Sequence, residues 1–169
     1  MPKRQPILMR PEFQDMLNDN KRIIFKICRA YTDNQEDFDD YQQECIVQLW
    51  QSFNSFKGAS KVSTWVYRVC LNVCLSQLRT KKRRIVTVRD VVIEQKDDQD
   101  ESDQENLESL YRAIRLLRES DRAIILLYLD DKSYKEMADI LGITVTNVGA
   151  KVNRVKNQLK TIINERFRH

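Results

Sequence analysis

Proline is confined to the first eleven residues of this 169-residue chain, at Pro2, Pro6 and Pro11. From Glu12 onward no proline interrupts the backbone, and the whole chain has only three glycines for tight turns. Because a β-rich chain of this length needs many turns, the distribution favours an all-α fold. Apolar residues make up 41% of the sequence, which is enough for a packed core. The sequence therefore predicts helices that form one medium domain or two small ones.

The first half of the chain predicts a three-helix bundle. Apolar side chains recur at helical spacing over residues 13–31, over residues 38–53, and from Thr64 into the basic cluster 79–84. Thr64 is a suitable N-cap for the third helix, and Gly58 marks the loop before it. We expect these helices to form an N-terminal domain over residues 1–84.

Residues 85–106 break this pattern. They begin with the β-prone stretch IVTVRDVVIE and continue with the acidic, polar stretch KDDQDESDQEN. Low apolar content with high charge cannot offset the entropy of ordering the chain. We therefore expect a flexible linker here, followed by a second small helical domain over residues 107–169.

The second domain carries the most specific pattern, a helix-turn-helix. Ser133 followed by Glu136 forms a capping box, and Gly142 suits the left-handed backbone that ends a helix. Thr144 is the expected cap of the next helix, and Val148 is expected to pack into the angle between the two. These offsets predict that the helix from Val145 onward recognises DNA. The competing interpretation is an ordinary pair of helices with a solvated outer face.

Further details of this domain follow from the same spacing. Asp121 is the expected N-cap of a helix over residues 122–129. The short helix after Ser133 is expected to bury Tyr134, Met137, Ala138 and Leu141. The exposed face of the recognition helix is expected to present Thr146, Asn147, Ala150, Lys151 and Arg154.

The charges alternate along the chain, although the net charge is only +4. Residues 31–44 carry six acids and no base, and residues 79–84 carry five bases. Residues 90–108 carry nine acids against Lys96, and residues 145–169 carry six Lys or Arg against Glu165. This layout favours a protein that meets DNA at two places and another protein elsewhere.

Residues 56–84 form a second candidate for nucleic-acid contact. A Ser/Thr-containing loop, the aromatic residues Trp65 and Tyr67, and the basic cluster follow one another. Aromatic faces stack on unpaired bases, and basic side chains bind phosphates. Aromatic residues at helical spacing also commonly belong to a core, so Trp65 has two interpretations at this point.

No pattern of catalytic, cofactor-binding or metal-binding residues is evident, so the chain is not expected to be an enzyme. The four cysteines at positions 28, 45, 70 and 74 are expected to be free, half-buried thiols. Cys70 and Cys74 share a helical face, but no second pair completes a metal site, and the only histidine is His169. No apolar run suits a membrane span or a signal peptide, so a cytoplasmic protein without membrane insertion is expected.

Together these motifs resemble the sigma factors of bacterial RNA polymerase, in their two-domain extracytoplasmic-function (ECF) group. The resemblance covers about residues 12–165. In the N-terminal half it rests on Asp40, Gln43, Glu44, Trp50, Thr64, Trp65, Tyr67, Arg68, Asn72 and residues 79–84. In the C-terminal half it rests on Leu116, Leu117, Arg122, Ser133, Tyr134, Glu136, Ala138, Leu141, Gly142, Ile143, Val148, Lys151, Arg154 and Leu159.

The resemblance implies a role for each segment. Core RNA polymerase would bind Asp40, Gln43 and Glu44, promoter DNA would be the second partner, and an anti-sigma protein the third. The melted −10 element would contact Ser60, Ser63, Thr64, Trp65, Arg68, Asn72, Arg79, Lys81, Lys82, Arg83 and Arg84. The double-stranded −35 element would contact Thr146, Asn147, Ala150, Lys151 and Arg154.

The chain departs from the family pattern at two places. Arg118 follows Leu117 where a proline is usual, and Gly149 stands where a lysine is common. Both departures bear on promoter strength and sequence.

Two other classes of protein compete with this interpretation. A stand-alone helix-turn-helix regulator explains only the second domain, and no spare apolar helix for dimerisation is evident. A nuclease with carboxylate-bound metal is supported only by the acidic runs.

Overall fold

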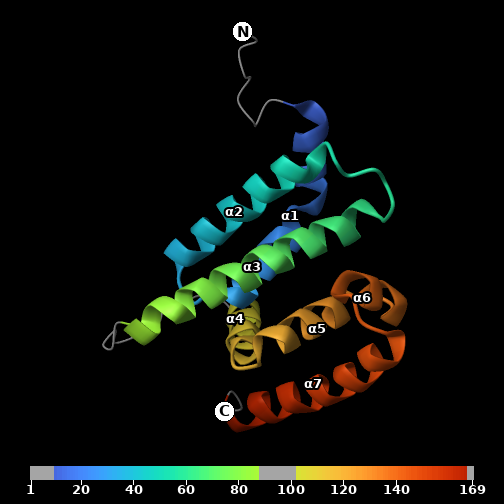
Figure 1. Ribbon diagram of the computed structural model, residues 1–169. Helices are drawn as coiled ribbons and strands as arrows, with labels where there is room; N and C mark the ends of the chain where they lie inside the picture. The colour runs from blue at the N-terminus through green and yellow to red at the C-terminus, as the bar shows by residue number, and fades with distance from the viewer. Residues whose placement is uncertain (1–9, 88–101, 167–169) are drawn as a thin grey trace.

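The computed structural model describes residues 10–87 and 102–166. The regular secondary structure in these ranges is entirely helical, without strands. This confirms the predicted all-α fold (Figure 1). The helices are α1 (Pro11–Tyr31), α2 (Gln35–Phe53), α3 (Val62–Thr87), α4 (Ser102–Arg115), α5 (Glu119–Leu129), α6 (Tyr134–Leu141) and α7 (Val145–Arg166). Within the described residues no helix is both long and apolar enough to span a bilayer.

Helices α1, α2 and α3 pack on one another and form the N-terminal bundle (Figure 1). Apolar side chains at helical spacing, such as Phe13, Ile24 and Leu49, are fully buried between them. The Asn34 side chain caps α2 by accepting a hydrogen bond from the Asp37 amide, 2.8 Å long. Helix α2 therefore begins earlier than the apolar spacing predicts.

Both ends of the linker predicted over residues 85–106 are helical in the structure. Helix α3 continues to Thr87, and α4 already begins at Ser102. The β-prone stretch thus starts inside a helix, because a continuing helix already satisfies the backbone hydrogen bonds of its next turn. The middle of the predicted linker, residues 88–101, lies outside the described residues.

Helices α6 and α7 form the predicted helix-turn-helix. The Ser133 hydroxyl accepts from the Glu136 amide at 3.1 Å, and the Glu136 carboxylate accepts from the Ser133 amide at 2.8 Å. Gly142 ends α6 with φ of +66°, in the left-handed region. The Thr144 hydroxyl accepts from the Asn147 amide at 3.2 Å, at the start of α7. Val148 is fully buried, so the predicted caps and the packing of Val148 into the angle of the motif are confirmed.

Two predictions for the C-terminal domain are wrong. Asp121 is not an N-cap; Arg118 occupies that position, and Asp121 lies inside α5 with 1% of its surface exposed. Tyr134 is 40% exposed and Leu141 is half-buried, although both were predicted to be buried; Ile140 is buried instead, with Met137 and Ala138. A short helix contributes only a narrow buried stripe, so its end residues are assigned poorly by spacing alone.

The four cysteines are free thiols, as predicted, but they are fully buried rather than half-buried. Contact with the Cys45 thiol and burial raise the pKa of Cys28 above its ordinary value. Contacts with the Cys28 and Cys45 thiols, together with burial, raise the pKa of Cys74 in the same direction. Cys28 and Cys74 are therefore neutral thiols at neutral pH.

Candidate nucleic-acid and protein interfaces

The face of α7 that was predicted to meet DNA is open to solvent at its first turns. Thr146, Asn147 and Ala150 are exposed, while Lys151 is half-buried. Gly149 lies beneath the Tyr134 ring, where an added Cβ would lie 3.4 Å from the ring carbon Cε2. That distance is ordinary van der Waals contact, so the structure does not explain the departure from the usual lysine.

Arg154 has a partner within the domain. Its guanidinium donates two hydrogen bonds to the Asp121 carboxylate, at 3.1 and 2.8 Å. The Asp121 side chain is 2% exposed and that of Arg154 is 49% exposed. Hydrogen bonds and charge from Asp121 raise the pKa of Arg154 above its ordinary value. The pair joins α5 to the recognition helix, so Arg154 holds that helix in place in this structure.

The aromatic segment at the start of α3 is packed rather than free. The Trp65 ring is half-buried and stacks on Phe56, with ring centroids 4.8 Å apart, and it also contacts Phe53. Thr64 is buried, and Ser60 and Ser63 are half-buried. Of the two interpretations of Trp65, the structure therefore favours a packing role.

Asn72 differs from these residues because it is exposed. Together with Glu44, Gln48 and Ser76 it lines an open groove between α2 and α3. An amide at the edge of a groove can donate to and accept from a base edge without distorting the bundle.

The basic cluster at the end of α3 is partly neutralised. Lys81 forms an ion pair with Asp37 of α2, and Lys82 forms one with Glu119 of α5. Arg79 is exposed. The side chains of Arg83 and Arg84 lie outside the described residues.

The residues predicted to bind polymerase lie together on α2. Asp40 and Gln43 are exposed, and Glu44 is half-buried with a hydrogen bond from the Gln48 amide at 3.1 Å. Val47, one turn after Gln43, is 39% exposed. The four residues form an acidic and apolar stripe, named the α2 stripe below, which suits a protein partner better than DNA.

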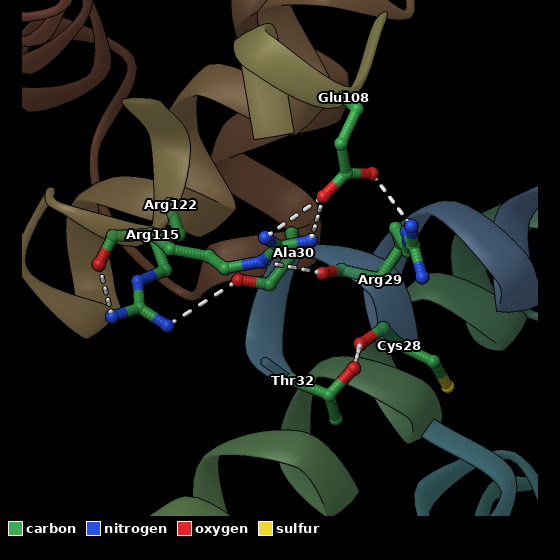
Figure 2. A network of polar contacts seen from close by, with 7 residues as sticks. All are labelled: Cys28, Arg29, Ala30, Thr32, Glu108, Arg115 and Arg122. Atoms are coloured by element: carbon green, nitrogen blue, oxygen red, sulfur yellow. Dashed lines mark hydrogen bonds and ion pairs between the residues drawn. The ribbon is translucent and has the colours of Figure 1, made fainter. Parts of the chain in front are cut away.

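The two domains contact each other through a polar network at the end of α1 (Figure 2). Arg29 donates to Glu108 of α4 at 2.5 Å, and Arg115 donates to the other Glu108 oxygen at 3.2 and 3.3 Å. Arg115 also donates to the Arg29 carbonyl at 3.3 Å, and Arg122 donates to the Ala30 carbonyl at 3.3 Å. Side chains from the second domain thus satisfy carbonyl groups that the last turn of α1 leaves free.

Glu108 is the anion of this network. Burial raises the pKa of its carboxyl, but hydrogen bonds and charge from Arg29 and Arg115 outweigh burial and hold the pKa below its ordinary value. The carboxylate therefore favours the packed state at neutral pH, and this contribution is lost as pH falls through the pKa in the folded protein.

A second set of contacts joins α1 and α3 to the C-terminal domain. Tyr67 and Lys26 both donate to the Asp130 carboxylate. Arg68 donates to the Asp139 carbonyl at 3.1 and 2.7 Å. With Lys82 on Glu119, two of the side chains predicted to bind DNA instead contact the second domain. Helical spacing could not predict this packing, because it joins residues that lie 37 to 104 positions apart.

Comparison with protein families identifies both halves of the chain. Residues 16–84 match the model for Sigma-70 region 2, and residues 107–159 match the model for Sigma-70 region 4.

Several curated proteins are similar over most of the chain. ECF RNA polymerase sigma factor SigG of Mycobacterium tuberculosis is 26% identical over 90% of this chain and 49% of its own length. SigW of Bacillus subtilis is 25% identical over 88% of this chain and 87% of its own length. The sigma-E factor of Escherichia coli is 29% identical over 73% and 72% of the two chains. The chain thus spans about half the length of SigG but most of SigW.

Two solved structures share the fold. The sigma factor RpoE, in complex with the anti-sigma factor NepR from Bartonella quintana, has a TM-score of 0.72 at 19% identity. The match covers 92% of this chain and 98% of RpoE. CnrH, in complex with the cytosolic domain of CnrY, has a TM-score of 0.69 at 17% identity, covering 95% and 93% of the two chains.

Proposed function

The chain belongs to the sigma-70 family, in its ECF group, and from this premise we propose that it binds core RNA polymerase and directs it to a subset of promoters. The observation that supports this most strongly is the order of the two matches, region 2 followed by region 4, on one chain. In this proposal the polymerase performs the chemistry in the cytoplasm, and the chain itself has no catalytic step.

Polymerase binding is assigned to the α2 stripe. Asp40 and Gln43 have exposed side chains that make no contribution to the core. The negative charge of Asp40 suits a basic surface on the partner, where complementary charge speeds association and orients the partners.

Recognition of the −35 element is assigned to the first turns of α7. Thr146, Asn147 and Ala150 are exposed and close to the N-terminus of the helix, which is the end that enters the major groove in helix-turn-helix proteins. Lys151 follows on the same face and suits a phosphate contact. Arg154 is assigned a positioning role, because Asp121 already occupies its guanidinium.

Contact with the −10 element is assigned to the loop before α3 and to the exposed residues of α3. Asn72 at the α2–α3 groove is the candidate for an unpaired base, and Arg79 for the phosphate backbone. Ser60, Ser63, Thr64 and Trp65 support the loop. Arg68 and Lys82 could reach DNA only after they leave the C-terminal domain, so we infer that promoter binding separates the two domains.

An anti-sigma protein is the expected inhibitor. RpoE, whose fold this chain shares, has been solved with the anti-sigma factor NepR. A protein that stabilises the packed arrangement would keep Arg68 and Lys82 away from DNA.

Mixing the purified chain with core RNA polymerase tests the proposal. A sigma factor should co-migrate with core polymerase on a native gel at a one-to-one ratio, without DNA. A stand-alone regulator would bind duplex DNA but not core polymerase. If the chain binds DNA and leaves core polymerase unbound, the proposal is wrong.

A further inference from the structure

Three buried cysteines from three different helices converge in the N-terminal bundle. Cys28 of α1, Cys45 of α2 and Cys74 of α3 have their sulfur atoms all within 4.8 Å of one another. The Cys28 and Cys45 sulfurs are 3.8 Å apart, and all three residues are 0% exposed. Sequence spacing missed the group, because it singled out the neighbours Cys70 and Cys74.

The spacing of the sulfurs suits a single ion bound by all three. With a metal–sulfur distance of about 2.3 Å, three sulfurs around one ion lie about 4.0 Å apart in a trigonal plane and slightly closer in a pyramid. Zinc in structural sites takes four ligands, and among the described residues the group contains only these three. An ion with three sulfur ligands therefore fits better than zinc.

Charge selects among such ions. Three thiolates contribute three negative charges, so a monovalent or divalent ion would leave a net negative charge in the core. Burying an unpaired charge is strongly unfavourable. Among the residues whose burial is described, no lysine or arginine is buried, so no cation in the core offsets such a charge. A trivalent ion leaves the site neutral.

We propose that Cys28, Cys45 and Cys74 form a three-sulfur site for a trivalent, thiol-binding ion of the arsenite and antimonite class. Soft thiolate ligands favour soft ions of this kind.

The binding reaction balances without a redox step. Neutral arsenous acid exchanges its three hydroxyl groups for three cysteine sulfurs. Three As–O bonds and three S–H bonds break, three As–S bonds form, and three water molecules leave. Because the reactants and the products are all neutral, binding leaves no net charge in the core.

The groove between α2 and α3 offers a route for a small neutral solute. Glu44 and Val73 line it, and they are the sequence neighbours of Cys45 and Cys74. Because the sulfurs themselves are fully buried, binding requires a local opening of the bundle and should be slow.

Native mass spectrometry of the full chain with sodium arsenite, in a phosphine reductant, tests the site. The parent chain should gain one arsenic and lose three hydrogens. Single Cys28→Ser, Cys45→Ser and Cys74→Ser variants should lose this adduct. Cys70→Ser is the matched control, since Cys70 is also a buried α3 cysteine but lies outside the group, and it should keep the adduct.

A second measurement uses only the parent chain, in case the serine variants fail to fold. Arsenite should slow the alkylation of the three grouped cysteines, mapped by peptide mass, and leave the rate at Cys70 unchanged. Absence of a one-to-one adduct, or equal protection of Cys70, would overturn the proposal and leave the thiols as apolar packing groups. An adduct with cadmium but none with arsenite would overturn the choice of a trivalent ion.

Discussion

Replacing Arg154 by alanine tests whether this residue positions the recognition helix or contacts DNA directly. The family pattern assigns it to DNA, whereas the structure joins it to the buried Asp121 carboxylate. A double-mutant cycle with Arg154→Ala and Asp121→Ala separates the two roles.

The two single substitutions should lower the unfolding free energy by different amounts, because Asp121 is more deeply buried than Arg154. Arg154→Ala leaves a carboxylate that is 2% exposed without its partner. Loss of a charged hydrogen-bond partner from a buried group costs about 2 kcal/mol of unfolding free energy. This figure takes into account that water can reach Asp121 once the half-exposed Arg154 side chain is removed. Asp121→Ala leaves a guanidinium that water can solvate, so about 1 kcal/mol is expected. The double variant should cost about as much as Asp121→Ala alone.

Urea unfolding followed by circular dichroism measures these free energies, and binding to duplex −35 DNA measures the second property. If Arg154 positions α7, both single variants should weaken DNA binding to a similar extent. The reasoning is refuted if Arg154→Ala leaves the unfolding free energy unchanged, or if it alone weakens DNA binding while Asp121→Ala does not.

Three further predictions concern the other surfaces. Reversing the charge of Asp40 and Glu44 should weaken binding to core polymerase without changing the helicity. The control Asp19→Lys, at an exposed position of α1, should leave this binding unchanged. Equal affinities of the parent chain and the charge-reversal variant in a native-gel titration would contradict the assignment. Asn72→Ala should reduce permanganate-reactive thymines in the promoter at an unchanged melting temperature, and full reactivity would remove its role in melting. The lowered pKa of Glu108 predicts that the two domains separate as pH falls through the pKa that Glu108 has in the folded protein. Small-angle scattering should show this transition for the parent chain and not for Glu108→Gln. An identical pH profile for the two proteins would contradict the role of Glu108.

Local signals in the sequence predicted the ends of α6 correctly, although Thr64, the expected N-cap of the third helix, lies inside α3. Ser133 and Glu136 mark the start of α6, and Gly142 marks its end. These signals lie close together in the sequence, and the structure confirms each of them. The resemblance to ECF sigma factors is confirmed by the matches to Sigma-70 regions 2 and 4, in the expected order, and by the similarity to ECF sigma factors over most of the chain.

Features that depend on distant residues could not be predicted. Asp121 looked like a cap because short acidic residues commonly begin helices, but its partner Arg154 lies 33 positions away. The cluster of Cys28, Cys45 and Cys74 was missed for the same reason, since these cysteines come from three helices. Likewise, spacing could show that Trp65 lies on a helix but not that Phe56 covers its face.

The assignment of residues to polymerase and DNA remains a prediction from the family pattern, to which the structure adds exposure and partners. Exposure supports Asp40, Gln43, Asn72, Thr146 and Asn147 as contact residues.

Run-off transcription tests the central claim most directly. Core RNA polymerase, the purified chain and a template with the promoter region of its own operon are combined at physiological salt. The account predicts a transcript of defined start that requires the chain and is absent with core polymerase alone. It is contradicted if the chain forms no complex with core polymerase and no chain-dependent transcript appears, while the same preparation still binds duplex DNA.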